Sequence, residues 1–249
     1  MEKPRYILAD MTWPEFREAL ATVDLALIPT GATEQHGPGG TFAVDTARAD
    51  GFTRLLAERL YPRAVAVPAI PFGFSPHHMP FPGTITLEAD TFQAVVEEVV
   101  GSLHRHGLRK FFILNAHGGN RDALDLAIAT LKDRYPEILI GWVQISGLVT
   151  DIRDPDGKES PLMGHGCERE LSQSLYLAPW TVRPAAMGPS PLTDRAMALH
   201  HPAIKVGKTF DEITRDGGLG NSANASYELG RRLIETALDR LTDWLQANF

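Results

Sequence analysis

Three short segments of the chain carry side chains that could bind metal ions. The first is Glu34-Gln35-His36, followed by Asp45, so that two carboxylates and an imidazole lie within a dozen residues. In an extended segment Glu34 and His36 point to the same side, because they are two positions apart. Carboxylate oxygen and imidazole nitrogen together suit zinc or manganese. The alternative is an ordinary polar surface loop with solvated charges, since Glu-x-His is a short pattern.

The second segment places a histidine where a strand is expected to end. His117 lies in Asn115-Ala116-His117-Gly118-Gly119-Asn120, directly after the apolar residues 111–114. The two glycines allow the backbone to approach a ligand closely. The alternative is a histidine that only satisfies a backbone carbonyl, with Asn120 capping the next helix.

The third segment runs from Gly164 to Ser172 and opens a predicted helix. Its residues His165 and Glu168 are three positions apart, which would place them on one helical face. Cys167 is a soft candidate ligand, but a single cysteine beside glycines is more typical of packing.

The other histidines are weaker candidates. His77 and His78 follow Ser75 in a predicted loop. Adjacent side chains face opposite ways in extended backbone, so at most one of these two histidines is expected to contact a substrate. The histidines expected on the surface, with no acidic residue in register, are His104, His106, His200 and His201.

Alternating strands and helices are expected to position these segments. Apolar runs predict strands at 25–29, 65–70, 111–114 and 138–143, and helical periodicity predicts helices at 13–21, 45–60, 91–106, 121–135 and 223–247. This order implies an α/β fold with right-handed crossovers and a mostly parallel sheet covered on both faces. The loops after Ile28, Ile70 and Leu114 are therefore expected to meet at the carboxyl edge of the sheet, where such folds bind ligands.

The composition is typical of one folded domain, which we expect to span residues 1–249. The chain is 43% hydrophobic and 22% charged, and no linker divides it. Its net charge of −7 offers no basic surface to a phosphate backbone, which argues against nucleic acid as a partner. No apolar segment has the length of a signal peptide or a membrane span. With a single cysteine, a cytoplasmic protein without a membrane partner is expected.

Several common enzyme classes lack their signature here. The sequence has no G-x-S-x-G nucleophile motif, no P-loop and no dinucleotide-binding fingerprint. Taken singly, each metal-binding signal is weak. Only their joint occurrence at the ends of successive predicted strands favours a metal-dependent enzyme.

Together these segments resemble the creatininase (creatinine amidohydrolase) family of metal-dependent hydrolases over nearly the whole chain. The motifs that carry the resemblance, in the family's order, are 28–38 with Asp45, 74–84, 115–120 and 165–172, with further support from 218–221. His-Gly-Gly-Asn at 117–120 indicates a subgroup other than creatininase proper. The resemblance implies a single-domain α/β/α sandwich, a small-molecule substrate and a homohexamer.

The resemblance also implies two divalent metal ions, zinc and/or manganese with iron as a further option. Glu34 and His117 would bind one ion and His36 the other, and Asp45 would bridge both.

The fifth ligand is the point at which this sequence departs from creatininase proper. That enzyme uses a glutamate two residues after the strand-end histidine, where this chain has Gly119. Relatives with His-Gly-Gly-Asn are expected to use the later segment instead. In that segment Glu168 aligns with the ligand, and Glu170 is the alternative.

The implied activity is hydrolysis of the C–N bond of a small amide or cyclic amide by water held between the two metal ions. The predicted catalytic residues are His165, as general acid or base, and the ligand Glu168. The residues predicted to contact the substrate are Ser75, His77, Gly118 and His165. The segment 160–164 lacks the aromatic and acidic contacts of creatininase proper, which argues against creatinine itself.

Two other functions are open at this point. One is a hydrolase that opens the ring of an oxidised inositol at the same metal site. The other is a non-catalytic binding protein on the same fold, which is disfavoured because at least four of the five ligand positions are intact.

Overall fold

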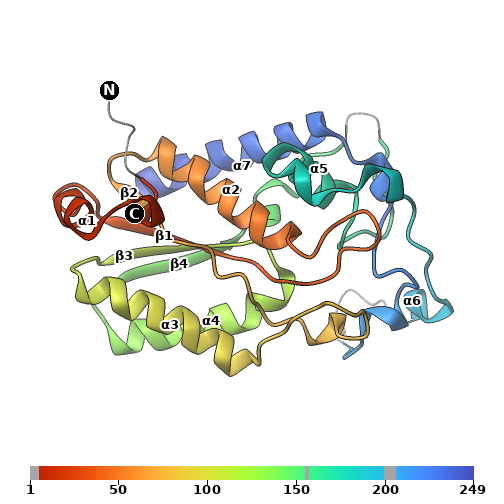
Figure 1. Ribbon diagram of the computed structural model, residues 1–249, viewed down its shortest axis with the longest axis horizontal. Helices are drawn as coiled ribbons and strands as arrows, with labels where there is room; N and C mark the ends of the chain where they lie inside the picture. The colour runs from red at the N-terminus through yellow and green to blue at the C-terminus, as the bar shows by residue number, and fades with distance from the viewer. Residues whose placement is uncertain (1–5, 155–156, 199–205) are drawn as a thin grey trace.

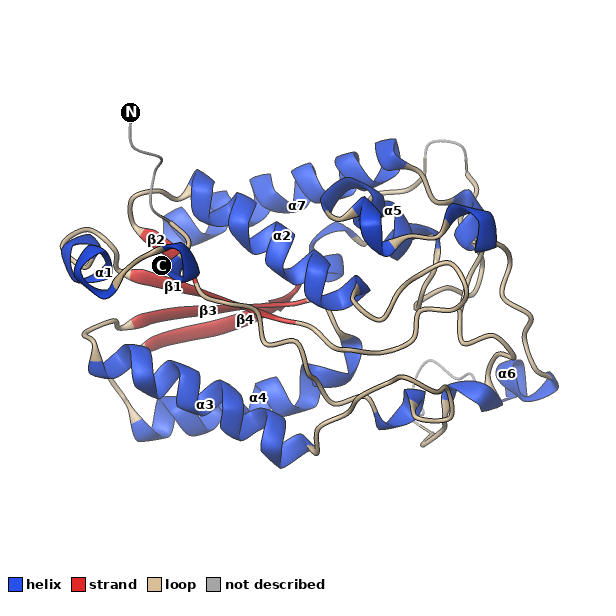
Figure 2. Cartoon of the chain, in the orientation of Figure 1, coloured by secondary structure: helices blue, strands red, loops and turns tan. Residues whose placement is uncertain are grey.

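A parallel sheet between two layers of helices forms the centre of the computed structural model, which describes residues 6–154, 157–198 and 206–249 (Figures 1 and 2). Its strands are β1 (Leu25–Thr30), β2 (Ala64–Ala66), β3 (Lys110–Asn115) and β4 (Leu139–Gln144). They lie in the order β2-β1-β3-β4, and every neighbouring pair is parallel. The predicted α/β fold with a mostly parallel sheet is thereby confirmed.

The two helical layers bury alternate residues of the strands. The helices α2 (Val44–Arg59), α5 (Glu168–Leu177) and α7 (Tyr227–Asn248) form one layer, and α3 (Ala89–Arg105) and α4 (Arg121–Arg134) form the other (Figure 1). Leu25 and Leu27 pack toward α2 and α7, whereas Ala26 and Ile28 pack toward α3 and α4. Because both faces are covered, every residue of β1 is buried, as its continuous apolar sequence predicts.

Shorter helices complete the described part of the chain. They are α1 (Trp13–Ala19), α6 (Asp194–Ala198) and the 3₁₀ helices Leu8–Asp10, Pro76–His78, Gly118–Asn120, Ile145–Val149, Pro179–Thr181, Pro184–Ala186, Phe210–Glu212 and Ser222–Asn224. None of the described helices is long and apolar enough to cross a membrane.

Two predicted elements are shorter than expected, for local reasons. The strand predicted at 65–70 ends at Ala66, because Pro68 has no N–H to donate to a sheet; beyond Ala66, Val67 N donates to Leu27 O at 3.0 Å and Ile70 N to Pro29 O at 2.9 Å. The helix predicted from 223 begins at Tyr227, where the Ser226 side chain caps it by accepting from Leu229 N.

The strand order creates a crevice between β1 and β3. The chain passes from β1 through α2 to β2 on one side, then through α3 back to β3 on the other side of β1. At such a switch point the loops that leave the two strands diverge and leave room for a ligand. The loop 31–43 leaves β1 there, and His117 follows β3 at the same edge.

Candidate metal centre

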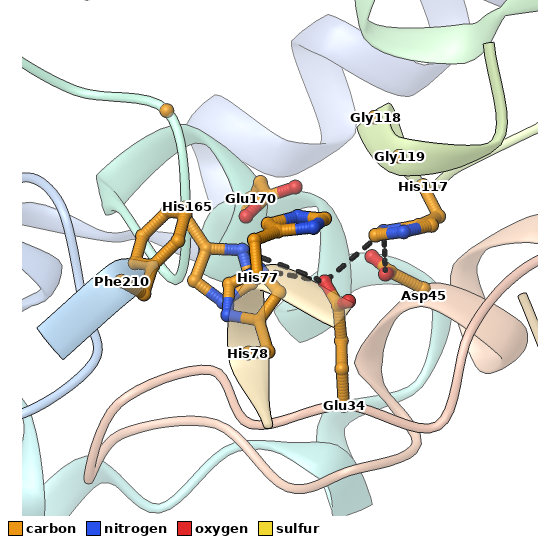
Figure 3. A pocket seen from close by; sticks show the side chains of 11 residues that line it. Glu34, Asp45, His77, His78, His117, Gly118, Gly119, His165, Glu170 and Phe210 are labelled. Atoms are coloured by element: carbon orange, nitrogen blue, oxygen red, sulfur yellow. Dashed lines mark ion pairs between the residues drawn. The ribbon is translucent and has the colours of Figure 1, made fainter. Parts of the chain in front are cut away.

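Carboxylate and imidazole side chains from separate loops meet at this crevice (Figure 3). The pocket has a volume of about 190 Å³, and its lining residues are Glu34, Asp45, His77, His78, His117, Gly118, Gly119, Gly164, His165, Glu170 and Phe210. These residues come from the loop after β1, the first turn of α2, the segment that follows β3, the 3₁₀ helices Pro76–His78 and Phe210–Glu212, and α5 with its preceding loop. The predicted convergence of strand-end loops is therefore present.

Two groups of candidate ligands share one carboxylate. Glu34, Asp45 and His117 form the first group, and His36, Asp45 and Glu170 form the second; within each group the ligand atoms lie within 4.8 Å of one another. His117 Nδ1 is 3.2 Å from Asp45 Oδ2, whereas His36 Nε2 is 3.2 Å from Asp45 Oδ1. Each oxygen of Asp45 thus faces one group, as in a carboxylate that bridges two cations.

The first group contains buried oxygens without a hydrogen-bond donor. Glu34 is 1% exposed, and while His117 is neutral neither of its carboxylate oxygens accepts a hydrogen bond within the described part of the chain; Asp45 Oδ2 is in the same situation. Burying a carboxylate without compensation is costly. The oxygens therefore fit a divalent cation, with His117 Nδ1 3.1 Å from Glu34 Oε1 as the nitrogen donor.

Backbone carbonyls set the tautomers of the two candidate histidine ligands. His117 Nε2 donates to Phe74 O at 3.0 Å, and His36 Nδ1 donates to Glu34 O at 3.1 Å. With those protons placed, the other ring nitrogen of each histidine faces the carboxylates and is available to a cation.

Protons stabilise this cluster when no cation is bound. Burial alone would lower the pKa of His117, but Glu34 and Asp45 raise it well above its ordinary value. Asp45 likewise outweighs burial and raises the pKa of His36 to about 9. The pKa of Asp45 lies well below its ordinary value, because His36 and His117 oppose the effect of burial. The site therefore attracts positive charge.

Glu170, and not the predicted ligand Glu168, reaches the cluster. Glu168 is fully buried, but its carboxylate accepts hydrogen bonds from Ser160 N at 2.5 Å and from Asn221 N at 2.8 Å, so it holds two loops together. The ligand role of Glu168 was implied by the resemblance, and the helical spacing separately placed Glu168 on one face with His165. In the structure α5 begins only at Glu168, so the helical spacing does not apply. The geometry replaces Glu168 with its alternative, Glu170, in the candidate ligand set.

The crowding at Gly119 explains why the remaining carboxylate comes from α5. A Cβ at this position would lie 2.2 Å from Phe74 O and 2.4 Å from His117 Nε2. A glutamate side chain therefore does not fit at position 119. At Gly118, by contrast, a Cβ would meet nothing within 4 Å.

The residues predicted to bind substrate fall into two sets. His77, Gly118 and His165 line the pocket, as expected for such a role. Ser75 does not line it: the residue is fully buried, and its Oγ is 3.2 Å from His117 Nε2, on the side of the ring away from the carboxylates. Ser75 thus contacts a candidate ligand and not the pocket, which corrects its predicted role.

Gln35 is a functional candidate that the sequence pattern did not single out. Its amide orientation is fixed, because Oε1 accepts from Gly37 N at 2.8 Å and Nε2 donates to Gly217 O at 3.0 Å. Nε2 also lies 2.7 Å from His78 Nδ1, which must then accept. His78 therefore carries its proton on Nε2, 3.5 Å from Glu34 Oε1. Only the position of Gln35 between two candidate ligands could have signalled this role.

The same residue orients His165. His165 Nε2 donates to Gln35 O at 2.5 Å, which leaves Nδ1 unprotonated and 3.7 Å from Glu34 Oε1. Burial, followed by the nearby His36, lowers the pKa of His165 to about 3. His165 is thus a neutral imidazole with a free lone pair next to the candidate cation ligands.

Phe210 is a second residue that the sequence did not indicate. Its ring centroid lies 4.2 Å from that of His78 and 4.8 Å from that of His165, so it closes one wall of the pocket (Figure 3). A single phenylalanine in a polar segment, 45 positions after His165, carries no recognisable pattern.

The remaining candidates lie away from the cluster. Cys167 is 3% exposed, and burial raises the pKa of its thiol to about 12, as expected for a packing residue. His106 is exposed, and the half-buried His104 lies 2.5 Å from Glu137 Oε1. His200 and His201 lie outside the described residues.

The fold and the site together define a class: a parallel α/β enzyme with a carboxylate and histidine centre at the switch point of its sheet. Residues 9–245 match the family model Creatininase, described as creatinine amidohydrolase. The chain belongs to the creatininase family, and it is a metal-binding hydrolase with amidohydrolase-like activity. This assignment argues against the alternative of a non-catalytic binding protein.

Relatives cover almost the whole chain. A 3-dehydro-scyllo-inosose hydrolase of Thermotoga maritima is 30% identical over 97% of this chain and 83% of its own length. A creatinine amidohydrolase of Pseudomonas putida is 26% identical over 97% of this chain and 96% of its own length. A crystal structure of a candidate creatinine amidohydrolase from Bacteroides fragilis is 29% identical, with a TM-score of 0.83 over 98% of this chain and 96% of that chain.

Two further creatininase structures share the fold. One is a mutant described as Zn-Zn type, which is 23% identical with a TM-score of 0.82 over 99% of both chains. The other is described as creatininase Mn and is 24% identical with a TM-score of 0.77 over 98% of this chain and 99% of that chain.

Proposed function

We propose that this chain uses two divalent cations to hydrolyse the C–N bond of a small amide or cyclic amide. The observation that carries the proposal is Asp45, whose two oxygens face two separate ligand groups. The buried oxygens of Glu34 that lack hydrogen-bond donors support a cation at the first group. The similarity to a creatinine amidohydrolase supports the choice of bond.

Zinc and manganese are the proposed cations. Glu34, Asp45 and His117 would hold one of them, and His36, Asp45 and Glu170 would hold the other. Mixed oxygen and nitrogen donors suit both metals. The related structures described as Zn-Zn and Mn types support the same choice.

The bound cations would activate a water molecule and polarise the substrate carbonyl. His165 is the proposed proton carrier, because its free Nδ1 faces the pocket, where it would lie between the attacking water and the leaving nitrogen. While His165 is protonated, its hydrogen bond to Gln35 O keeps the ring in place.

The shape of the pocket favours a small substrate. A volume of about 190 Å³ leaves room for a small ring, not for a long peptide segment. Because a Cβ at Gly118 would meet no atom within 4 Å, the backbone at this position is accessible to a substrate, and His77 forms part of the pocket wall. These two residues are the proposed substrate contacts besides His165.

The Asp45→Ala variant tests the proposal. Loss of the shared carboxylate should reduce the cation content, measured by mass spectrometry of the metal-reconstituted protein, from about two equivalents to one or none. Hydrolysis of a panel of small cyclic amides should fall at least about 100-fold, because a cation contributes several kcal/mol to the transition state. Full cation content and unchanged turnover in the folded variant would refute the proposal.

A second candidate function is the hydrolytic ring opening of an oxidised inositol. The observation that favours it is the 30% identity to a 3-dehydro-scyllo-inosose hydrolase. Mass spectrometry of the products distinguishes the two functions. Incubation with cyclic amides other than creatinine should yield a ring-opened product with a new carboxylate and a new amine, whereas turnover of oxidised inositols alone would favour the second candidate.

The homohexamer and the cytoplasmic location stay predictions. Light scattering of the purified protein measures the first, and localisation of a tagged chain in cells measures the second.

A further inference from the structure

The side-chain amide of Gln35 is held in one orientation between two backbone groups. Its Oε1 accepts from Gly37 N at 2.8 Å, and its Nε2 donates to Gly217 O at 3.0 Å. Gly217 has a φ of +86°, and a Cβ at that position would lie 2.0 Å from Gln35 Oε1, so only glycine leaves room for the amide. The second proton on Gln35 Nε2 is directed at His78 Nδ1, 2.7 Å away, which therefore accepts it.

This contact leaves His78 with a buried N–H group at the pocket. His78 is 1% exposed and lines the pocket together with His77, because residues 76–78 form a 3₁₀ helix and not an extended segment. Within the described part of the chain Nε2 of His78 makes no hydrogen bond, and Glu34 Oε1, at 3.5 Å, is too distant for a strong one. Because a buried N–H without an acceptor is costly, the group is suited to an acceptor on a bound molecule.

The backbone of Gln35 has the opposite effect on the neighbouring imidazole. His165 Nε2 donates to Gln35 O, which leaves His165 Nδ1 without a proton. The rings of His78 and His165 stack with their centroids 4.1 Å apart. Their other nitrogens lie 3.5 Å and 3.7 Å from the same atom, Glu34 Oε1 (Figure 3). One N–H donor and one bare nitrogen therefore lie side by side at the pocket.

Hydrolysis of an amide needs both kinds of group. When water adds to the carbonyl carbon, an electron pair of the C=O bond moves to the oxygen, and the water gives up a proton. A bare imidazole nitrogen can accept that proton. A fixed N–H donor stabilises the negative charge on the oxygen, and it does so without a proton transfer of its own.

We propose that His78 is a catalytic residue that donates a hydrogen bond from Nε2 to the carbonyl oxygen of the substrate, and that Gln35 is a positioning residue that keeps the proton on this nitrogen. The inference rests on the proposed function, since it assumes hydrolysis of an amide. It also excludes His78 as a cation ligand. The ligand atoms of Glu34, His77 and His78 lie within 4.8 Å of one another, but a protonated ring nitrogen does not bind a cation.

Nitrogen NMR of the cation-free full-length protein, labelled at its histidines, tests the position of the proton. The wild type should carry the His78 proton on Nε2, and His78→Phe assigns the signal by removing it. Gln35→Glu should move the proton to Nδ1, because a carboxylate accepts hydrogen bonds and does not donate them. Gln246→Glu is the matched control: it adds the same charge at an exposed position of α7 and should leave the proton on Nε2.

Turnover of the cyclic amide that the cation-loaded wild type hydrolyses fastest tests the hydrogen bond to the substrate. His78→Phe keeps a flat ring but has no donor, and it should lower kcat about 100- to 1,000-fold with KM changed less than about threefold. Gln35→Glu should lower kcat in the same way. His78→Gln can still present an amide N–H and should recover at least about tenfold of the lost kcat. A role limited to packing would give no such recovery.

A proton on Nδ1 of His78 in the wild type would overturn the inference even if no variant folds. A kcat of the folded His78→Phe variant within about threefold of the wild type would also overturn it, and so would loss of a bound cation in that variant, which would identify His78 as a ligand. In all three cases the wild type still hydrolyses the amide and the proposed function stands. Failure of the wild type to hydrolyse any cyclic amide would instead refute the proposed function.

Discussion

Individual hydrogen bonds decide which atoms of the site are free to react. His117 and His36 each give one ring proton to a backbone carbonyl, so their second nitrogen faces the carboxylates. His165 gives its proton to Gln35 O and presents a bare Nδ1 to the pocket. The same residue type therefore has two proposed roles, cation ligand and proton carrier, and the local partner of each ring separates them.

His165→Gln tests the second role. The variant should lower kcat about 100- to 10,000-fold, the usual contribution of a general acid or base. Its cation content should stay at about two equivalents, because neither proposed cation site uses His165, although its ring nitrogen also lies within 4.8 Å of ligand atoms of Glu34 and His36. Turnover and metal content of the purified variant are the measurements.

His106→Gln is the control, since His106 is exposed and lies outside the pocket. Loss of a cation in the His165 variant would identify this residue as a ligand and contradict its role as proton carrier.

Not every side-chain role could be predicted from the sequence. The spacing within Glu34-Gln35-His36 and Asp45 indicated ligands that the structure does bring together. The choice between Glu168 and Glu170 depends on where α5 begins, and the sequence does not give that boundary. The sequence placed Ser75 in the correct loop. Only the tertiary structure shows that its Oγ contacts His117 Nε2, on the side of the ring away from the carboxylates.

At the scale of elements, close packing restricts which residue types fit at position 119 of the motif 115–120. The 3₁₀ helix Gly118–Asn120 lies against the loop around Phe74, so position 119 has no room for a side chain. The helix α5 then supplies Glu170 as the candidate carboxylate.

Gly119→Ala should therefore destabilise the protein by about 1–3 kcal/mol, as overpacking usually does. The added methyl group would contact Phe74 O and His117 Nε2, which moves a candidate ligand and weakens cation binding. Denaturant unfolding measures the first effect and calorimetry the second.

Gly118→Ala is the matched control, because its Cβ would meet no atom within 4 Å. Its unfolding free energy should stay within about 0.5 kcal/mol of the wild type. Equal stability of the two variants would contradict the close contact at position 119.

The strands could be predicted from their continuous apolar runs, and the long helices from apolar residues at helical spacing. The apolar run of β1 reflects burial on both faces, and the amphipathic pattern of α3 reflects burial on one. The irregular region between α5 and α7 could not be predicted in detail. Its proline-rich turns pack through tertiary contacts, and so does Phe210, which completes the pocket wall.

At the scale of the whole molecule, the strand order determines where the acidic side chains of the candidate metal centre come together. The strand order opens a crevice beside β1, and the chain fills that crevice with Glu34, Asp45 and Glu170. Two buried carboxylates and a partly buried one in one place destabilise a folded protein unless positive charge accompanies them. Protonated histidines and Arg48, whose guanidinium contacts Asp45 and Glu170, supply part of that charge, and bound cations would supply the rest.

Cation binding should therefore stabilise the fold. At a free Zn²⁺ or Mn²⁺ concentration 100-fold above Kd, one bound cation adds about 2.7 kcal/mol, which raises Tm by at least about 5 °C for a chain of this size. Thermal unfolding of the chelator-treated and reloaded protein measures the shift. Asp45→Ala should show a smaller rise, and an unchanged Tm in the wild type would contradict cation binding to the folded state.

The central claim is that Asp45 joins two cation sites. Anomalous X-ray diffraction from crystals grown with Zn²⁺ or Mn²⁺ tests it most directly, because the signal locates each metal ion. We predict two peaks on opposite sides of the Asp45 carboxylate, one beside Glu34 and His117 and the other beside His36 and Glu170. A single peak with no contact to Asp45, or no peak at this carboxylate at saturating metal, would contradict the claim.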